Sequence, residues 1–309
     1  MTKGGLLAAF FVPKFHIQKA CFMDVKQLPT LAVLSDYVTV CELDGIKVVR
    51  VIHPKATATI SLFGAHVLSF QPTGKKDTIW MSENADFGGS KAIRGGIPVC
   101  WPWFGKVAEP SHGFARTSEW TLNEHRENDE GVIISLTLQD SAETRAIWPH
   151  AFKAELLVEV TDTLDVKLVS TNTGDTPFQL GGALHTYLNI GDITTTTVSS
   201  LGNEYIEGGV RKPSAGNTTF DQEVDRIYPH ADETVVVDDP ALQRRLNVIN
   251  GGNNGVVVWN PWKALSISMG DMADNSYETM VCVESAVHDR SVTLNAGETH
   301  TLSTKIVSC

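Results

Sequence analysis

The chain has 309 residues, of which 42% are hydrophobic and 20% are charged, and these values are ordinary for a globular protein. This length fits either one large β domain or two domains of usual size. The formal net charge of −11 argues against a nucleic-acid partner, because a nucleic-acid binder needs a basic surface to displace counterions. An anionic ligand would need a local cluster of Arg or Lys.

The N-terminal residues 1–25 lack the pattern of the remaining sequence. Their apolar run, residues 6–12, lies at the lower limit of a secretory signal and far below the ~18 residues of a membrane-spanning helix. Pro13 and Lys14 then interrupt it. We interpret residues 1–25 as an extension, and we expect a cytoplasmic protein without a membrane partner.

The cysteines favour the same compartment. Their number is odd and no two have Cys-x-x-Cys spacing, which is typical of reduced thiols rather than of a disulfide framework. They are Cys21, Cys41, Cys100, Cys282 and Cys309.

Short segments that alternate and are rich in Val, Ile and Thr predict β-strands along the chain. They are residues 37–41, 46–51, 58–62, 132–138, 156–160, 166–170, 256–259 and 265–269. Asp44-Gly45 joins the first two at hairpin spacing, and residues 251–255, rich in Gly and Asn, join two more strands. Residues 239–245, with Pro240 in the first turn, are the one candidate for a short helix.

Many strands without a βαβ rhythm predict an all-β chain in which antiparallel sheets pack face to face. We see no linker, charge block or low-complexity tract that would divide it. We therefore expect a single large antiparallel β-sandwich domain over residues 26–309.

Two loop-like segments carry arginines. In residues 93–105, Arg94 precedes a Gly-Gly pair and three aromatic residues, which suits a sugar phosphate, although Arg94 could equally pair with a core carboxylate. In residues 111–116, His112 and Arg116 flank Gly113. Alone this segment is typical of a solvated loop, but two guanidinium groups together can bind one phosphate by bidentate hydrogen bonds.

Two strand-like segments carry ionisable groups. His185 lies in residues 181–190, where a histidine is more often a satisfied core residue than a catalyst. If it faces a polar pocket, it can act as a general acid. Glu284 lies among hydrophobic residues in 280–286 and must be either ion-paired or functional. Burial would raise the pKa of its carboxyl group and make it a better base.

Several familiar chemistries have no sequence support. The chain has no P-loop, no strand-linked GxGxxG, no HExxH, no Cys/His cluster with metal spacing and no GxSxG. Nucleotide binding, a metal site of familiar spacing and Ser-His-Asp hydrolysis therefore have no support. One His, one Glu, two Arg and several aromatics remain, and this set suits proton transfer on a phosphorylated sugar.

The chain resembles the glucose-6-phosphate 1-epimerases, a branch of the aldose 1-epimerase superfamily with a galactose mutarotase-like fold. The resemblance covers nearly everything after about residue 30, and eight short motifs in register carry it. They are residues 64–69, 79–83, 94–105, 111–116, 184–192, 223–228, 258–262 and 280–286. The resemblance implies an isomerase with a β-supersandwich fold and no cofactor or metal.

The resemblance also implies roles for individual residues. His185 matches the family's catalytic acid and Glu284 its catalytic base. The residues that match substrate-binding positions are Arg94, Arg116, Asp225 and, with a looser match, His112. Ser111 departs from the Gln of some members, which affects one hydrogen bond.

These matches lead to a functional expectation. We expect a monomeric hexose-6-phosphate mutarotase that interconverts the α and β anomers of glucose 6-phosphate. Glu284 would take the proton of the anomeric hydroxyl while His185 protonates the ring oxygen, the two groups lying on opposite sides of C1 and O5. The alternatives are an aldose 1-epimerase of free hexoses, a non-catalytic carbohydrate-binding sandwich, and a glycosidase that uses Asp225 and Glu284.

Overall fold

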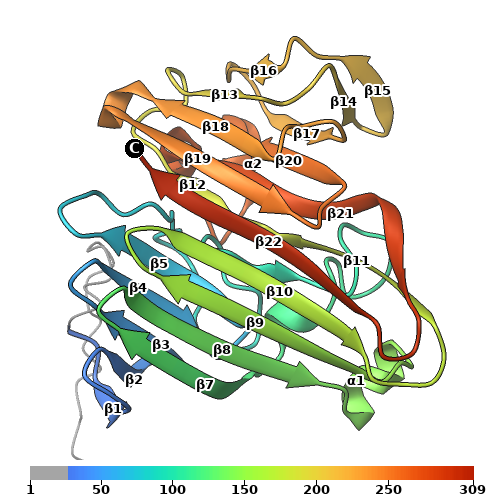
Figure 1. The fold of residues 1–309 in the computed structure, drawn as a ribbon. Helices are drawn as coiled ribbons and strands as arrows, with labels where there is room; N and C mark the ends of the chain where they lie inside the picture. Colours follow the sequence, from blue (N-terminus) through green and yellow to red (C-terminus); the bar gives the residue numbers. More distant parts are fainter. Residues whose placement is uncertain (1–26) are drawn as a thin grey trace, which may run out of the picture.

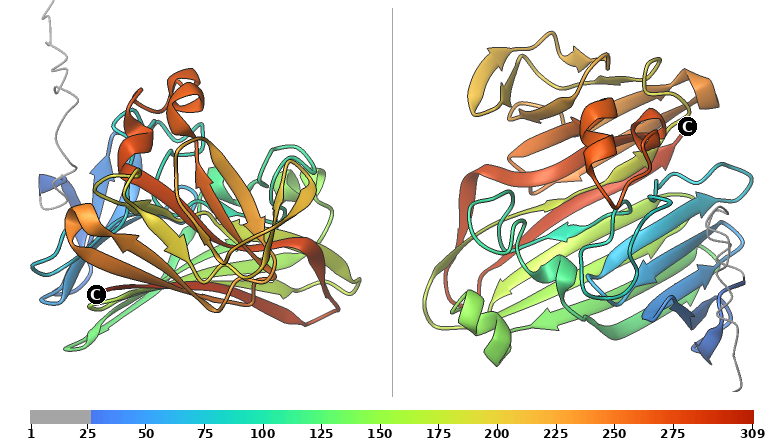
Figure 2. Two further views of the ribbon diagram at one scale, coloured as in Figure 1. Left: turned by 90° about the horizontal axis from the view of Figure 1, so that it is seen from above. Right: turned by 180° about the vertical axis from the view of Figure 1, so that it is seen from behind.

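The computed structural model describes residues 27–309, so the predicted extension, residues 1–25, lies outside the described residues. The described chain forms three sheets in which every strand pair is antiparallel (Figures 1 and 2), which confirms the predicted all-β sandwich. One hydrophobic cluster contains residues of all three sheets, for example Val49, Leu156 and Val283.

The strands are ordered as follows. The five-stranded sheet runs β1 (Thr30–Val33), β2 (Val38–Leu43), β3 (Ile46–Ile52), β4 (Ala56–Ser61), β5 (His66–Pro72). The nine-stranded sheet runs β16 (Asn217–Thr218), β13 (Thr197–Ser199), β18 (Thr234–Asp239), β19 (Arg244–Gly251), β22 (Thr299–Ser308), β10 (Leu164–Asn172), β9 (Phe152–Val160), β8 (Gly131–Gln139), β7 (Thr121–Asn128). The eight-stranded sheet runs β15 (Val210–Pro213), β14 (Glu204–Glu207), β17 (Val224–Tyr228), β20 (Gly255–Asn260), β21 (Met280–Leu294), β11 (Phe178–Leu184), β6 (Val99–Cys100), with β12 (Tyr187–Asn189) also paired to β21.

Helices in the described residues are short. They are α1 (Ala142–Ile147), α2 (Trp262–Ser268) and the 3-10 turns η2 (Ala115–Thr117), η3 (Pro240–Leu242) and η4 (Ser276–Thr279). None of these helices is both long and apolar enough to cross a membrane.

The two predicted turns have different outcomes. Asp44 and Gly45 both have positive φ, 46° and 103°, and join β2 to β3 as the predicted hairpin. Residues 251–255 do connect two strands, β19 and β20. These strands belong to different sheets, however, so the glycine-rich loop carries the chain from one layer of the sandwich to the other.

The strand predicted at residues 265–269 is wrong, because this segment lies mostly in α2. The side chain of Asn260 accepts the N–H of Trp262 at 2.8 Å and donates to the carbonyls of Tyr277 and Met280, which fixes the chain at the start of the helix. The Leu-Ser-Ile-Ser alternation therefore does not mark a half-buried strand, and Ile267 is 51% exposed.

The helix prediction for residues 239–245 holds for one turn only. η3 ends at Leu242, its C-cap Gln243 has a φ of 52°, and β19 begins at the next residue. Helix α1 was missed. It has a capping box in which the Ser141 side chain accepts the N–H of Thr144 and the Thr144 hydroxyl accepts the N–H of Ser141, but Thr144 stands where the usual sequence signature has Glu or Gln.

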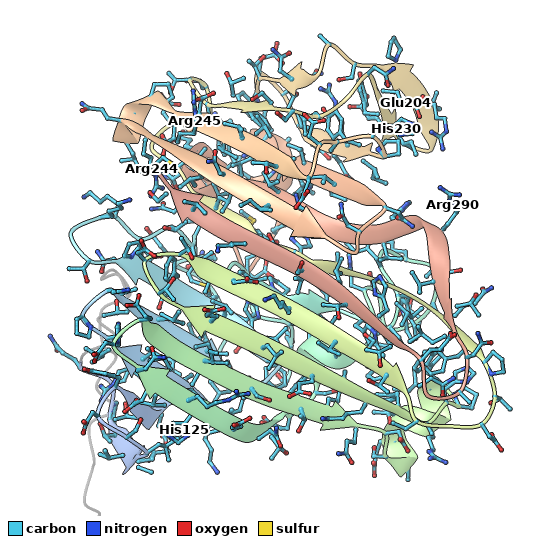
Figure 3. All side chains as sticks on the ribbon, in the orientation of Figure 1. His125, Glu204, His230, Arg244, Arg245 and Arg290 are labelled. Carbon is cyan, nitrogen blue, oxygen red and sulfur yellow. The ribbon has the colours of Figure 1, made fainter. Side chains whose placement is uncertain are left out.

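Two consecutive arginines at the start of β19 point to opposite faces of the sheet (Figure 3). Arg245 pairs with Asp238 at the surface, 2.7 Å apart. Arg244 turns inward, pairs with the buried Asp239 at 3.2 Å and donates to the Asn189 carbonyl at the end of β12. This buried ion pair ties the nine-stranded sheet to the strand that follows His185.

Close packing of two loops gives a stability prediction. Gly113 and Gly105 both have positive φ, but a Cβ at Gly113 would lie 2.0 Å from the Trp101 carbonyl oxygen, whereas one at Gly105 would meet nothing within 4 Å. We expect Gly105→Ala to cost about 1–2 kcal/mol in free energy of unfolding through the left-handed backbone alone. Gly113→Ala should cost a further ~1–3 kcal/mol from the clash. Denaturant unfolding measures both, and equal losses would contradict this packing.

Candidate active site

The functional residues lie on the face of the eight-stranded sheet that is turned away from the main core. The alternation of β21 sorts its side chains between the two faces. Val281, Val283 and Val287 belong to the main core cluster. Cys282 and Glu284 therefore point to the other side, where further strands of the sheet contribute their own alternate residues.

Pairing between strands places these residues in two rows. In one row, Asp225 of β17 stands opposite Trp259 of β20, which stands opposite Cys282, which in turn stands opposite Tyr187 of β12. In the next row, Val257 of β20 stands opposite Glu284. Three long-range strand pairings thus bring distant parts of the sequence to one small area.

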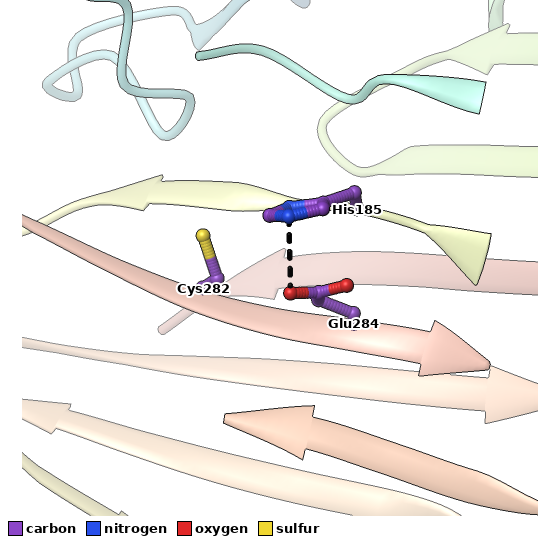
Figure 4. A group of neighbouring side chains, drawn as sticks. All are labelled: His185, Cys282 and Glu284. Atoms are coloured by element: carbon purple, nitrogen blue, oxygen red, sulfur yellow. Dashed lines mark ion pairs between the residues drawn. The ribbon is translucent and has the colours of Figure 1, made fainter. Parts of the chain in front are cut away.

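His185 follows the end of β11 and reaches Glu284 (Figure 4). Its backbone N–H donates to the Pro98 carbonyl at 3.0 Å, and its ring stacks on Tyr187 with 4.8 Å between centroids and 10° between planes. Its Nε2 lies 3.4 Å from Oε1 of Glu284. The structure therefore brings the predicted acid and base together, across 99 positions of sequence.

Each member of this pair has a second polar atom that is buried and has no hydrogen-bond partner among the described residues. These atoms are Nδ1 of His185 and Oε2 of Glu284. Glu284 is 1% exposed. Buried polar atoms in proteins are nearly always satisfied, so unpartnered atoms on both members of an acid–base pair make the pair a candidate functional site.

Burial controls the protonation of the pair. It raises the pKa of Glu284 well above its usual range, with a further contribution from the charge of Asp225. Burial also lowers the pKa of His185 well below its usual range, assisted by His112, Arg94 and Arg116. Both shifts disfavour the charged forms of the unliganded pair, a carboxylate and an imidazolium.

The expected placement of the acid and base on opposite sides of C1 and O5 stays a prediction. The structure has Nε2 and Oε1 only 3.4 Å apart, so a sugar ring does not fit between these two atoms as they stand. The reason is local: His185 sits just beyond β11, which pairs directly with the strand that carries Glu284.

Arg94 is held beside this pair by a tight turn. Gly95 and Gly96 both have positive φ, and a Cβ at Gly95 would come within 2.7 Å of the Met81 Cα, so only glycine lets the chain pass so close. Nε and Nη2 of Arg94 each lie 3.1 Å from Oδ2 of Asp271. Nη1 donates to the Tyr187 hydroxyl at 2.9 Å. The carboxylate that pairs with Arg94 is thus a partly exposed loop residue.

Arg116 and His112 complete the cationic side of the site. Nη2 of Arg116 donates to the Ser111 carbonyl at 2.9 Å, and in the described part of the chain its other donors have no partner. The rings of His112 and His185 lie 6.1 Å apart between centroids. Burial lowers the pKa of His112 to about 4, and Arg116, then Arg94, contribute. Both predicted arginines therefore lower the pKa of both histidines.

Asp225 lies at the edge of this cluster. It is exposed on β17, opposite Trp259, and its charge raises the pKa of Glu284. This position suits a contact to sugar hydroxyls at the far side of the site.

Three residues of the site were not singled out from the sequence. Tyr187 and Cys282 could have been found by the period of two, since each stands two positions from a predicted catalytic residue on the same face. Asp271 had no signal, because it comes from the loop after α2. His185, Cys282 and Glu284 each have one atom able to ligate a metal ion, and these three atoms lie within 4.8 Å of one another. The positions of these residues in the sequence do not show that they form a cluster.

Two surface depressions lie elsewhere. One of about 300 Å³ is lined by residues 238–240, 243–245 and Cys309, and one of about 550 Å³ is lined by residues 200, 202–203, 214–216, 230 and 232. Neither contains a residue of the acid–base cluster. The site is therefore defined by converging side chains and not by these depressions.

A buried carboxyl and an imidazole in contact, with two arginines nearby on a β-sheet, suit an enzyme that moves protons on a small polar molecule. Comparison with known proteins agrees with this class. The family model described as aldose 1-epimerase matches residues 47–307. The chain belongs to the aldose 1-epimerase family.

Individual relatives give the same result. The chain is 41% identical over 266 residues to a protein of Escherichia coli named "Putative glucose-6-phosphate 1-epimerase", covering 84% of this chain and 89% of that protein. It is 36% identical to the crystal structure of a "putative mutarotase (YeaD)" from Salmonella typhimurium, with a TM-score of 0.89 over 92% of this chain and 98% of that one. A galactose mutarotase-like protein from Clostridium acetobutylicum, 14% identical, shares the fold with a TM-score of 0.69 over 88% and 98% of the two chains.

The electrostatic arrangement predicts the effect of removing one arginine. Because Arg116 lowers the pKa of His112 and of His185, Arg116→Gln should raise both pKa values towards the usual range for histidine. Histidine NMR titration measures them directly. Arg145→Gln is the matched control. Arg145 lies on α1 in an exposed ion pair with Asp140, so its replacement should change the pKa of neither histidine. An unchanged His112 in Arg116→Gln would show that the two side chains do not face each other.

Proposed function

We propose that the protein is a hexose-6-phosphate mutarotase, which interconverts the α and β anomers of glucose 6-phosphate. The observation that carries the proposal is the buried pair of His185 and Glu284, in contact at 3.4 Å, with Arg116 still able to donate beside it. The names of the relatives point to the same substrate class. His185 is the proposed acid and Glu284 the proposed base.

The geometry suits the two oxygens of an anomeric centre. O1 and O5 are both bonded to C1, so they lie closer together than Nε2 and Oε1 of the pair. Each protein atom can then reach one oxygen at hydrogen-bond distance from the same side. Oε1 of Glu284 accepts the hydrogen of O1, and Nε2 of His185 donates to O5.

Proton transfer and ring opening balance within the pair. The O1 proton passes to Glu284, C1–O1 becomes a carbonyl, the C1–O5 bond breaks, and the proton of His185 passes to O5. After rotation about C1–C2, O5 attacks the other face of the carbonyl and both protons return. Each assisted transfer typically contributes about 10²–10⁴ in rate.

Substrate binding selects the reactive form of the pair. The neutral form and the ion-pair form, imidazolium beside carboxylate, differ only in the position of one proton. A hydrogen bond from O1–H to Glu284 stabilises the carboxylate, and one from His185 to O5 stabilises the imidazolium. The sugar therefore moves the proton to His185, where the mechanism needs it.

The arginines divide the work of phosphate binding. Arg94 is already paired with Asp271 and Tyr187, so it orients these groups and adds positive charge. Arg116 has donors available in the described part of the chain and is the principal phosphate ligand, with Arg94 assisting. Asp225 and His112 contact the sugar. A fixed phosphate leaves C1 free to rotate between its two faces.

We also infer that the chain acts as a monomer in the cytoplasm, with residues 26–309 as one domain. In its support, Cys41, Cys100, Cys282 and Cys309 are free thiols.

The proposal is tested by anomer exchange of glucose 6-phosphate, followed by NMR beside glucose and galactose. The wild type should accelerate exchange of the phosphate ester. Glu284→Gln should lower the rate by about 10²-fold or more, because it removes one assisted transfer, while leaving sugar-phosphate binding nearly intact. Binding without acceleration of any sugar would identify a carbohydrate-binding protein, and equal rates for glucose would favour the free-hexose epimerase.

The phosphate site is tested separately. Arg116→Gln removes a charge-assisted contact of about 1.5–3 kcal/mol, so kcat/KM for glucose 6-phosphate should fall about 10–100-fold. Any residual rate with unphosphorylated glucose should stay within about twofold, because that sugar makes no such contact. Arg145→Gln again serves as the control. A parallel loss with both sugars would mean that Arg116 supports the fold of the site and does not bind phosphate.

A further inference from the structure

Cys282 gives the acid–base pair a third ligand atom that the proton-transfer mechanism does not use. It stands two residues before Glu284 on the same face of β21, and its thiol is fully buried. Ligand atoms of Cys282, His185 and Glu284 all lie within 4.8 Å of one another (Figure 4). Two of them, Nε2 and Oε1, are 3.4 Å apart.

This arrangement matches the coordination shell of a small divalent ion. Ligands at about 2.0–2.3 Å from tetrahedral Zn²⁺ lie somewhat more than 3 Å from one another, so the His–Glu separation already fits. Sulfur, imidazole and carboxylate together are the donor types that Zn²⁺ accepts, and a thiolate selects against Mg²⁺ and Ca²⁺. Thiolate and carboxylate supply two negative charges to balance the ion.

The surroundings of Glu284 and Cys282 also favour a bound ion. Oε2 of Glu284 is buried without a hydrogen-bond partner in the described part of the chain, so the carboxylate keeps an acceptor that no protein group uses. Cys282 also packs among Trp80, Tyr187 and Met280, which form an apolar wall behind it. Such a wall keeps competing water from the sulfur side and leaves one coordination position towards the substrate.

We propose that His185, Cys282 and Glu284 form an inhibitory site for a thiophilic divalent cation of the Zn²⁺ class. Binding releases the thiol proton of Cys282 and the shared proton of the pair to solvent, and the metal takes the place of both. Metal binding itself does not depend on the proposed function. Inhibition does rest on it, because Nε2 and Oε1 are the atoms that would touch O5 and O1, so metal and sugar exclude each other.

The test uses Cd²⁺ as a probe, because its bond to a thiolate gives an ultraviolet charge-transfer band. The full-length background is Cys21→Ser with Cys309→Ser, which removes the exposed Cys309 thiol. One equivalent of Cd²⁺ should produce the band, and glucose 6-phosphate should displace the metal. Cys282→Ser in this background should abolish the band and weaken Zn²⁺ binding by more than the ~10–100-fold typical of an outer-shell change.

Cys41→Ser is the matched control, since Cys41 is an equally buried strand thiol in the five-stranded sheet. It should keep the band and the affinity, and thermal unfolding of both variants verifies that they are folded. An absent band, or the same band in Cys282→Ser, overturns the metal site. A band that depends on Cys282 in a protein without anomer exchange keeps the site and rejects the proposed function.

Discussion

The burial of one carboxyl group, that of Glu284, governs the chemistry of this protein. A strand in a sandwich normally places apolar residues on a covered face, and an ionisable group there must give up its hydration. Glu284 is 1% exposed, and its nearest ionisable contact is an imidazole at 3.4 Å. The low polarity of the surroundings therefore disfavours the charged form of both groups.

The architecture explains how such a pair can be held. β21 is 15 residues long and pairs with β20 on one side and with β11 and β12 on the other. Its inner side chains belong to the main core, so the strand cannot shift without disturbing all three sheets. His185 is fixed by its backbone bond to Pro98 and by the parallel ring of Tyr187. His185 and Glu284 are thus held by strand pairing and by the main core, while Arg94 and Asp271 come from loops around them.

The sequence was sufficient for the features that depend on local pattern. Alternation predicted strands and the antiparallel sandwich, and the Asp44-Gly45 turn was correct because positive φ at two positions has a strong residue signature. The sequence pattern failed at α2, where it predicted a strand. There the Asn260 side chain fixes the chain direction through hydrogen bonds to carbonyls 17 and 20 positions away. The pattern also gave no signal for Asp271 or for the short distance between His185 and Glu284. Those depend on which strands become neighbours, and a single sequence does not encode that in any short window.

Arg94 shows a further effect of the architecture. A free arginine side chain has about 2 kcal/mol of rotamer entropy to lose when it is ordered. Here the ion pair with Asp271 and the hydrogen bond to Tyr187 hold the guanidinium in one orientation before any ligand arrives. The entropy cost of ordering this side chain therefore falls on folding and not on ligand binding. A ligand that meets this side chain meets a preorganised surface, so its affinity depends on charge and shape rather than on the freezing of a long flexible chain.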